Sequence, residues 1–118
     1  MDGDVTDDTA AVIARHLAAV RSGDPEAMAA DYSADAVLER PDGTHHGQPA
    51  ILAYFRTVPD RLGGGEVVFG RTEVSDEVAV IRWRIVRGPG DGASGSDTCT
   101  VRDGMIVHQR VQLDSNDF

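Results

Sequence analysis

Hydrophobic residues recur at intervals of three or four in three stretches of the chain, which is the spacing of one face of an α-helix. In the first stretch Val12, Leu17 and Val20 share such a face with His16, so a histidine is set into an apolar surface. The second stretch starts with Asp24 as a capping residue and has a proline at its first helical position. This pattern predicts helices over residues 6–22, 24–32 and 49–58.

Elsewhere hydrophobic and polar residues alternate, which is typical of strands with one buried face. Strands are predicted over residues 35–40, 44–47, 66–74 and 77–86, and a hairpin over 96–113 turns at Asp103-Gly104. Residues 59–65 and 88–95 are rich in glycine and are predicted as loops. Because consecutive strands follow segregated helices, we expect one α+β domain over residues 1–118 with a mainly antiparallel sheet.

The alternation also predicts which strand residues face the interior. Trp83 belongs to the apolar set of its strand, whereas Arg82 and Arg84 fall on the opposite face. In the final hairpin, Asp97 and Gln109 share the parity of the apolar residues Cys99, Val101, Val107, Val111 and Leu113. Two polar side chains are therefore expected on a face that otherwise forms the core.

The alternation leaves open which of Glu39 and Arg40 points inward. Arg40 shares the parity of Leu38 and Ala36, but Val37 with Glu39 is nearly as good an inward set. An inward Glu39 would supply a carboxylate base. An inward arginine, whose pKa exceeds about 12, cannot accept a proton near neutrality and would stabilise negative charge instead. Next to Asp97 it would lower the carboxyl pKa by ~1–3 units and keep the group ionised.

Composition narrows the possible partners and chemistry. The net charge is −9 and no basic run occurs, so we expect binding neither to nucleic acid nor to a membrane. No run approaches 18 apolar residues and the start is acidic, which predicts a cytoplasmic protein. All eleven basic residues are arginine, which excludes Schiff-base chemistry at lysine. Cys99 is the only cysteine, and adjacent strand residues such as His45 and His46 point to opposite faces, so no metal site is expected.

Two stretches, "IARHLAAVRSGDPEAMAADYSADAVLERPDGTHHGQPAILAYF" and "SGSDTCTVRDGMIVHQ", together with the order of elements, resemble the nuclear transport factor 2-like superfamily. The resemblance covers nearly the whole chain and is strongest to the SnoaL-like and ketosteroid isomerase-like branch. It implies a cone-shaped α+β barrel in which three N-terminal helices pack on a curved sheet. It also implies an open end that admits a small hydrophobic molecule, and assembly as a homodimer.

The resemblance also suggests roles for single residues. Asp97 falls where ketosteroid isomerase keeps a protonated aspartic acid that donates to the developing enolate. His16 stands in place of the oxyanion-hole tyrosine, and Arg40 in place of the catalytic base. The expected substrate-binding set is Tyr32, Tyr54, Phe55, Trp83, Gln109 and Leu113.

We therefore expect an enzyme of the SnoaL-like type that needs no metal or redox cofactor. Its substrate would be a hydrophobic, polycyclic or polyketide-like carbonyl compound that undergoes isomerisation, cyclisation or dehydration. Asp97 would be the acid–base group, Arg40 an electrostatic stabiliser and His16 a proton donor or relay. One alternative is an epoxide hydrolase of the limonene type, for which Arg40 and Asp97 supply two parts of an Asp-Arg-Asp arrangement. Another is a non-catalytic ligand carrier or dimeric structural module. Arg40 and Asp97 could also form a purely structural ion pair in an inert core.

Overall fold

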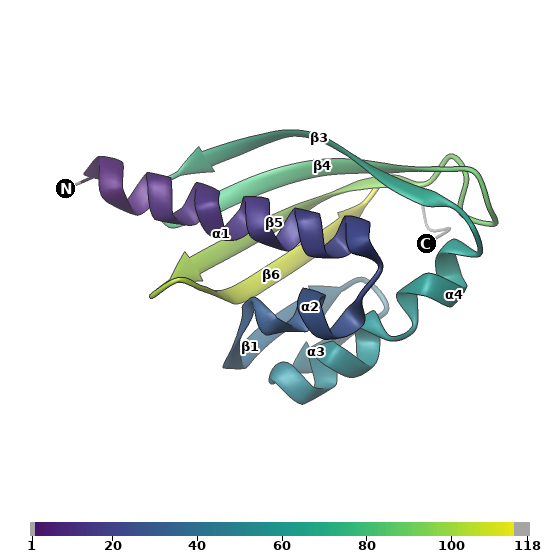
Figure 1. Ribbon diagram of the computed structural model, residues 1–118, viewed down its shortest axis with the longest axis horizontal. Helices are drawn as coiled ribbons and strands as arrows, with labels where there is room; N and C mark the ends of the chain where they lie inside the picture. Colours follow the sequence, from purple (N-terminus) through teal and green to yellow (C-terminus); the bar gives the residue numbers. More distant parts are fainter. Residues whose placement is uncertain (1, 115–118) are drawn as a thin grey trace.

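The computed structural model describes residues 2–114, and it describes the side chains of residues 5–114 (Figure 1). The helices are α1 (Asp2–Ser22), α2 (Pro25–Ala30), α3 (Gln48–Phe55) and α4 (Val58–Leu62). The strands are β1 (Tyr32–Arg40), β2 (Gly43–His46), β3 (Glu66–Ser75), β4 (Val78–Val86), β5 (Ser94–Arg102) and β6 (Met105–Leu113). None of the helices among the described residues is long and apolar enough to cross a membrane.

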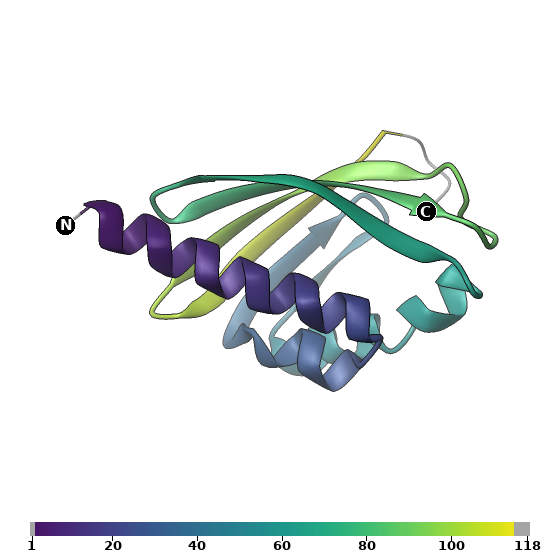
Figure 2. The same cartoon turned by 45° about the horizontal axis from the view of Figure 1, so that its top comes forward.

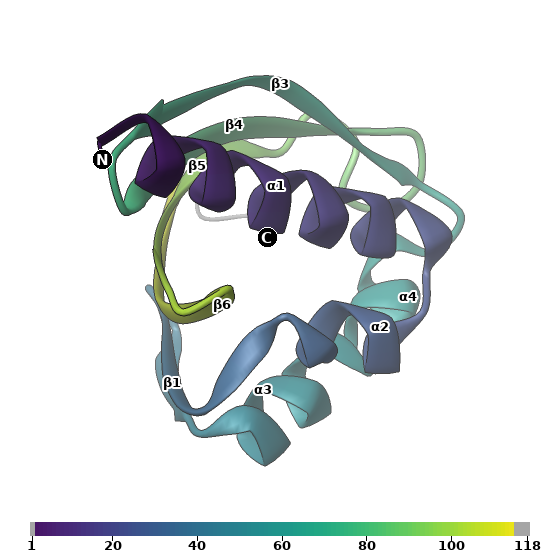
Figure 3. The same cartoon turned by 60° about the vertical axis from the view of Figure 1, so that its left-hand side comes forward.

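All six strands belong to one sheet in the order β2-β1-β6-β5-β4-β3. Every neighbouring pair is antiparallel except β1 and β6, which run parallel. The sheet curves, and α1, α2 and α3 lie on its concave side, as Figures 2 and 3 show. The predicted fold, α+β with three N-terminal helices on a curved and mainly antiparallel sheet, is confirmed.

The helices form where their caps and apolar faces were predicted, with three differences at their ends. The second helix ends at Ala30 and not at Tyr32, which already belongs to β1. Asp24 caps α2, its Oδ1 accepting the backbone N–H of Glu26 at 3.0 Å. The first helix, however, begins at Asp2 and not at Thr6. The third ends at Phe55, because Pro59 lacks the N–H that would bond the carbonyl of residue 55 and its ring crowds that carbonyl.

The segment predicted as the end of one helix and a loop instead contains the separate helix α4. Pro59 lies in its first turn, where the missing N–H costs nothing, and Gly63 ends it with a left-handed φ of 52°. Beyond it, a Cβ on Gly65 would lie 2.4 Å from the Arg87 carbonyl oxygen. A Cβ on Gly88 would lie 2.3 Å from the Leu62 carbonyl oxygen. The two glycine-rich segments thus pack backbone against backbone, at the end of the barrel where α4 lies (Figure 1).

The strands bury the predicted faces except near one bulge. On β4, Ile81 and Trp83 are buried while Arg82 is exposed, as the alternation predicts. On β6 the prediction of an inward Val107 is wrong, because the buried residue is Ile106. The pairing of β5 with β6 shifts between Thr100 and Val101, which leaves Val107 as an extra residue in a bulge. The residues of β6 before the bulge therefore face the opposite side from the one that the alternation predicts.

Strand β1 also begins earlier than predicted, at Tyr32 and not at residue 35. The side chain of Tyr32 is fully buried, and its backbone is paired with Ile106 of β6. The first residues of β1 are therefore held in the strand by pairing with β6, which is far away in the sequence. The strand propensities of the residues themselves do not predict such a pairing.

Candidate active site

An open cavity of about 80 Å³ lies between the concave face of the sheet and helices α1 and α3. Most of its wall is apolar, built from residues such as Leu17, Val20, Val67, Phe69, Ile81 and Ile85. Its polar lining includes His16, Arg40, Tyr54, Asp97 and Gln109. A concave apolar space with a few convergent polar groups is the usual form of a small-molecule site.

Asp97 lies on β5 and is held by two donors from neighbouring strands. Trp83 Nε1 on β4 donates to Oδ1 at 3.0 Å, and Gln109 Nε2 on β6 donates to Oδ2 at 3.1 Å. Its exposure is intermediate and it lines the cavity, so protein surrounds the carboxyl group while a ligand can still reach it. The inward parity predicted for Asp97 and Gln109 is what brings the two side chains together.

Burial raises the pKa of Asp97 to about 6. The hydrogen bond from Trp83, the positive charges of His16 and Arg40 and the hydrogen bond from Gln109 act in the opposite direction, and burial outweighs them. The expectation that Arg40 would lower this pKa below its usual value is therefore wrong. Asp97 instead titrates close to neutrality, where it can both accept and donate a proton.

Arg40 is the residue of the pair at the end of β1 that points into the barrel. Its side chain is 3% exposed, and Nη1 donates to the Tyr54 hydroxyl at 2.8 Å. Its Nε also contacts Asp42 Oδ1 at 3.2 Å, and the Asp42 side chain is 57% exposed. Glu39 points to the opposite face, where it lies 2.5 Å from His108 Nε2. The base that an inward Glu39 would have supplied is therefore not in the cavity.

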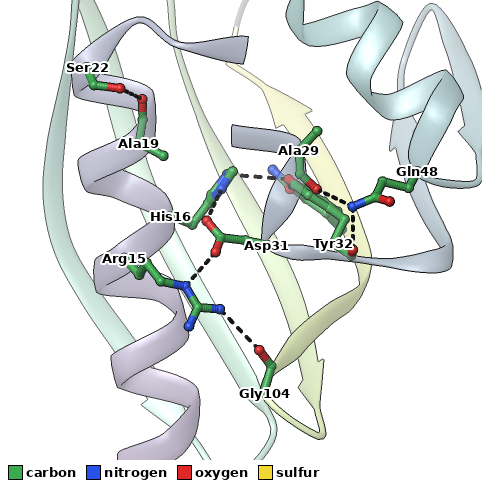
Figure 4. Close-up of polar contacts among 10 residues, drawn as sticks. Arg15, His16, Ala19, Ser22, Ala29, Asp31, Tyr32, Gln48 and Gly104 are labelled. Atoms are coloured by element: carbon green, nitrogen blue, oxygen red, sulfur yellow. Dashed lines mark hydrogen bonds and ion pairs between the residues drawn. The ribbon is translucent and has the colours of Figure 1, made fainter. Parts of the chain in front are cut away.

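His16 reaches the cavity from α1 and is fixed by residues around the start of β1 (Figure 4). Its Nε2 lies 3.4 Å from the Tyr32 hydroxyl, and its Nδ1 lies 3.4 Å from Asp31 Oδ2. Arg15, one residue earlier on α1, places Nε 2.6 Å from Asp31 Oδ1. Burial raises the pKa of Asp31, but the hydrogen bonds and charges of His16 and Arg15 outweigh it and hold the pKa below its usual value.

Seven of the nine residues expected at the site do line the cavity, and two do not. Those that line it are His16, Arg40, Tyr54, Phe55, Trp83, Asp97 and Gln109. Tyr32 lies behind the wall, where its hydroxyl donates to Gln109 Oε1. Leu113 packs against the edge of the core and lines a separate depression with Glu39 and Arg110.

Asp31 is the polar group that the sequence pattern did not single out. It is 4% exposed although it follows directly after α2, and its burial depends on α1 crossing the start of β1. An acidic residue next to an aromatic residue expected in the pocket is a weak signal. Among the described residues, no group of three or more His, Cys, Asp or Glu side chains is placed to hold a metal ion.

Comparisons with known proteins agree with this architecture. A structure of an NTF2-like protein of unknown function from Mesorhizobium loti superposes with a TM-score of 0.82 and 23% identity, covering 93% of each chain. A protein from Sinorhizobium meliloti that was proposed to be a polyketide cyclase superposes with a TM-score of 0.76 and 22% identity, covering 86% of this chain and 93% of its own. TerC, crystallised with polyporic acid, superposes with a TM-score of 0.77 and 20% identity, covering 91% of this chain and 92% of its own.

A search of curated proteins finds no match to the sequence. The model of the SnoaL-like domain family, in contrast, matches residues 13–109 and so covers most of the chain, including every polar residue that lines the cavity. The resemblance seen in the sequence is thereby confirmed, and the chain belongs to the SnoaL-like domain family.

Proposed function

We propose that the protein is an enzyme that moves protons on a small, hydrophobic, carbonyl-containing molecule. The reaction would be of the isomerase or cyclase kind, through an enol or enolate, and would use side chains alone without metal or redox cofactor. The apolar wall supports a hydrophobic substrate, and the family membership supports this kind of chemistry.

The observation that carries the proposal is the state of Asp97. A carboxyl group with a pKa of about 6 that faces an apolar cavity is matched to general acid–base catalysis near neutral pH. A non-catalytic carrier needs the cavity but has no use for a titrating carboxyl group in it. Trp83 and Gln109 fix the carboxyl plane, which supports a positioned base able to take an α-hydrogen from a ketone.

Arg40 would stabilise the oxygen of the resulting enolate. Its guanidinium lies 5.0 Å from the centre of the Tyr54 ring and donates to the Tyr54 hydroxyl, so it is held at the cavity wall. A fixed positive charge in a site from which protein excludes water stabilises developing negative charge more strongly than it would in water. Tyr54 would supply a second donor close by.

The cavity sets a limit on the size of the substrate. Its volume of about 80 Å³ is smaller than the roughly 150 Å³ of a cavity known to admit benzene. The cavity is thus too small to enclose even one ring, so a ketone of one or two rings would extend through its open side or move the lining side chains apart.

An epoxide hydrolase of the limonene type receives less support. Arg40 and Asp97 both line the cavity, but of the carboxylates in residues 5–114 only Asp97 lines it. The second aspartate of that arrangement has no counterpart there.

The proposal is tested with a probe ketone whose α-hydrogens exchange with solvent. We expect the protein to accelerate deuterium incorporation into 2-tetralone in D2O, followed by proton NMR. The Asp97→Asn variant should lose about 10²–10⁴-fold in rate, because the base is gone. Asp103→Asn, the same change at an exposed position of the same hairpin, should retain the wild-type rate.

Trp83 reports binding independently, because it is the only tryptophan and it lines the cavity. Ketones that change its fluorescence without any exchange in either protein would make the chain a binder and sink the enzymatic proposal. Full activity in Asp97→Asn would show that another group is the base.

Two further expectations complete the proposal. Homodimers would form across the convex face of the sheet, where Arg82, Arg84, Arg102 and Arg110 are exposed. Sedimentation would show the mass of a single chain if this is wrong. The protein would act in the cytoplasm, which cell fractionation tests.

A further inference from the structure

A chain of polar side chains leads from the surface to the cavity carboxylate. Arg15, whose side chain is 59% exposed, contacts Asp31, and Asp31 faces His16 (Figure 4). His16 contacts the Tyr32 hydroxyl, which donates to Gln109, and Gln109 donates to Asp97. Only His16, Gln109 and Asp97 of this chain line the cavity, so the rest of it lies outside the space a substrate would occupy.

The direction of these hydrogen bonds fixes one proton on His16. Gln109 points its Nε2 at Asp97, so its Oε1 faces Tyr32 and must accept the Tyr32 proton. A tyrosine hydroxyl has one proton, which is then used. The contact of 3.4 Å between Tyr32 and His16 Nε2 can be a hydrogen bond only if His16 is the donor.

A second proton follows from the other side of the ring. His16 Nδ1 and Asp31 Oδ2 face each other at 3.4 Å, and neither atom has any other hydrogen-bond partner. Arg15 Nε lies 2.6 Å from Asp31 Oδ1 and favours the carboxylate, so an unprotonated His16 Nδ1 would set a lone pair against a buried negative charge. A proton on Nδ1 removes that repulsion and makes His16 an imidazolium.

We propose that Asp31 keeps His16 cationic and that His16, through Tyr32 and Gln109, holds Asp97 as a carboxylate ready to accept a proton. Asp31 is then a positioning residue that never touches the substrate. The catalytic meaning of this inference rests on the proposed function, but the protonation states do not.

The imidazolium acts on Asp97 in two ways. Its charge favours the carboxylate directly, which opposes the effect of burial. It also fixes the direction of the chain. A proton on Asp97 Oδ2 that pointed at Gln109 would require the Gln109 amide to turn over and point its Nε2 at Tyr32. Tyr32 would then donate to His16 Nε2, which already carries a proton, so the reversed chain is unfavourable.

Other charged or titratable groups face these two residues and contribute to their charge states. Around Asp97 they are His16 from α1, Arg40 and Tyr32 from β1, Tyr54 from α3 and Cys99 from its own strand. Around His16 they are Arg15 from its own helix, Asp31 after α2, Tyr32 from β1 and Asp97 from β5. Asp31 is the only carboxylate in direct contact with His16 among the described residues, which makes it the group to change.

NMR of the ligand-free wild-type protein tests the protonation states without any substrate. Nitrogen-15 shifts of His16 at pH 7.5 should be those of an imidazolium with protons on both nitrogens. Carbon-13 shifts of the Asp97 carboxyl group give its titration midpoint in the same sample. A neutral His16 ring at pH 7.5 would overturn the inference.

The Asp31→Asn variant should release the extra proton of His16. We expect a neutral ring at pH 7.5 and an Asp97 titration midpoint at least about half a unit higher, because a nearby cation is lost. Asp35→Asn removes a charge from an exposed position on β1, the strand that follows Asp31, and should change neither signal. An unchanged Asp97 midpoint in a folded Asp31→Asn protein contradicts the proposal.

Tyr32→Phe is the second variant, used in place of Asp31→Asn should the latter fail to fold. It keeps the charges of Asp31 and His16 but breaks the series of hydrogen bonds between His16 and Asp97. The titration midpoint of Asp97 should therefore rise while His16 stays protonated. A midpoint that does not rise contradicts the hydrogen-bonded coupling.

Activity separates this inference from the proposed function. Exchange of 2-tetralone by Asp31→Asn should fall at pH 6.5 and recover at pH 8, where the weaker acid is again ionised. A purely structural defect would lower the rate equally at both pH values and would contradict the positioning role. Absence of exchange in the wild type, with His16 an imidazolium, would defeat the proposed function and leave the charge coupling intact.

Discussion

The concave and convex faces of the sheet carry the same kinds of charged residue in opposite circumstances. On the convex side, Arg102 contacts Glu77 at 3.1 Å with side chains that are 63% and 46% exposed. On the concave side Arg40 is 3% exposed, and Asp97 is held by two directed donors. Charges on the first face are screened by water, whereas on the second their protonation depends on the surrounding protein.

Adjacent positions on β4 give the largest contrast between the faces. Ile81 is 2% exposed and Arg82 is exposed on the convex side. We expect Ile81→Ala to lower the free energy of unfolding by about 2–5 kcal/mol, because it leaves a void in the core. Arg82→Ala should change it by no more than about 0.5 kcal/mol. Urea unfolding measures both, and equal effects would mean that the faces are misassigned.

The pH dependence of stability sharpens the comparison at Asp97. Its pKa rises from 3.8 in the unfolded reference to about 6 in the fold, so between these values the folded state binds a proton that the unfolded state has released. Proton binding by Asp97 therefore adds about 3 kcal/mol to the free energy of unfolding below pH 3.8. This contribution is lost as the pH rises from 3.8 through about 6.

Asp97→Asn should remove this decline, so that its stability relative to the wild type increases between pH 4 and pH 6.5. Urea titrations at several pH values measure the difference. A difference that stays constant with pH would show that burial does not control the ionisation of Asp97. Asp103→Asn, at the exposed turn, serves as the control that should track the wild type.

The smallest effect is expected for the ion pair between Arg102 and Glu77. A double-mutant cycle with Arg102→Ala and Glu77→Ala should give a coupling of about 0–1 kcal/mol, which falls further in 1 M salt. A coupling of several kcal/mol that resists salt would show that the convex face is covered in solution, as a dimer interface would cover it.

Much of the fold could be read from the sequence because its signals are local. Asp24 and Pro25 mark the start of α2, and the alternation along β4 identifies Trp83 as an inward residue. Parity also favoured an inward Arg40 and placed Asp97 on the same face as Gln109. Each of these depends only on the period of a helix or a strand.

The features of the fold and the site that could not be predicted from the sequence depend on contacts between segments that are far apart in the chain. The bulge at Val107 reverses parity only because β5 and β6 pair out of step. The role of Asp31 requires α1 to lie across the start of β1, where His16 meets it. The ionisation of Asp97 is a balance between burial and several charges, and its sign cannot be inferred before the depth of the site is known.

The position of β6 has a consequence for how the barrel assembles. Because β6 lies between β1 and β5, the helices with β1 and β2 join the β3–β5 meander in one sheet only through this strand. Its pairing of Tyr32 with Ile106 joins residues far apart in the chain, which slows folding through the entropy of closing a long loop. We expect the concave apolar surface to stay open until that last pairing forms, so that slow insertion of β6 is the step at which the protein is most prone to aggregate.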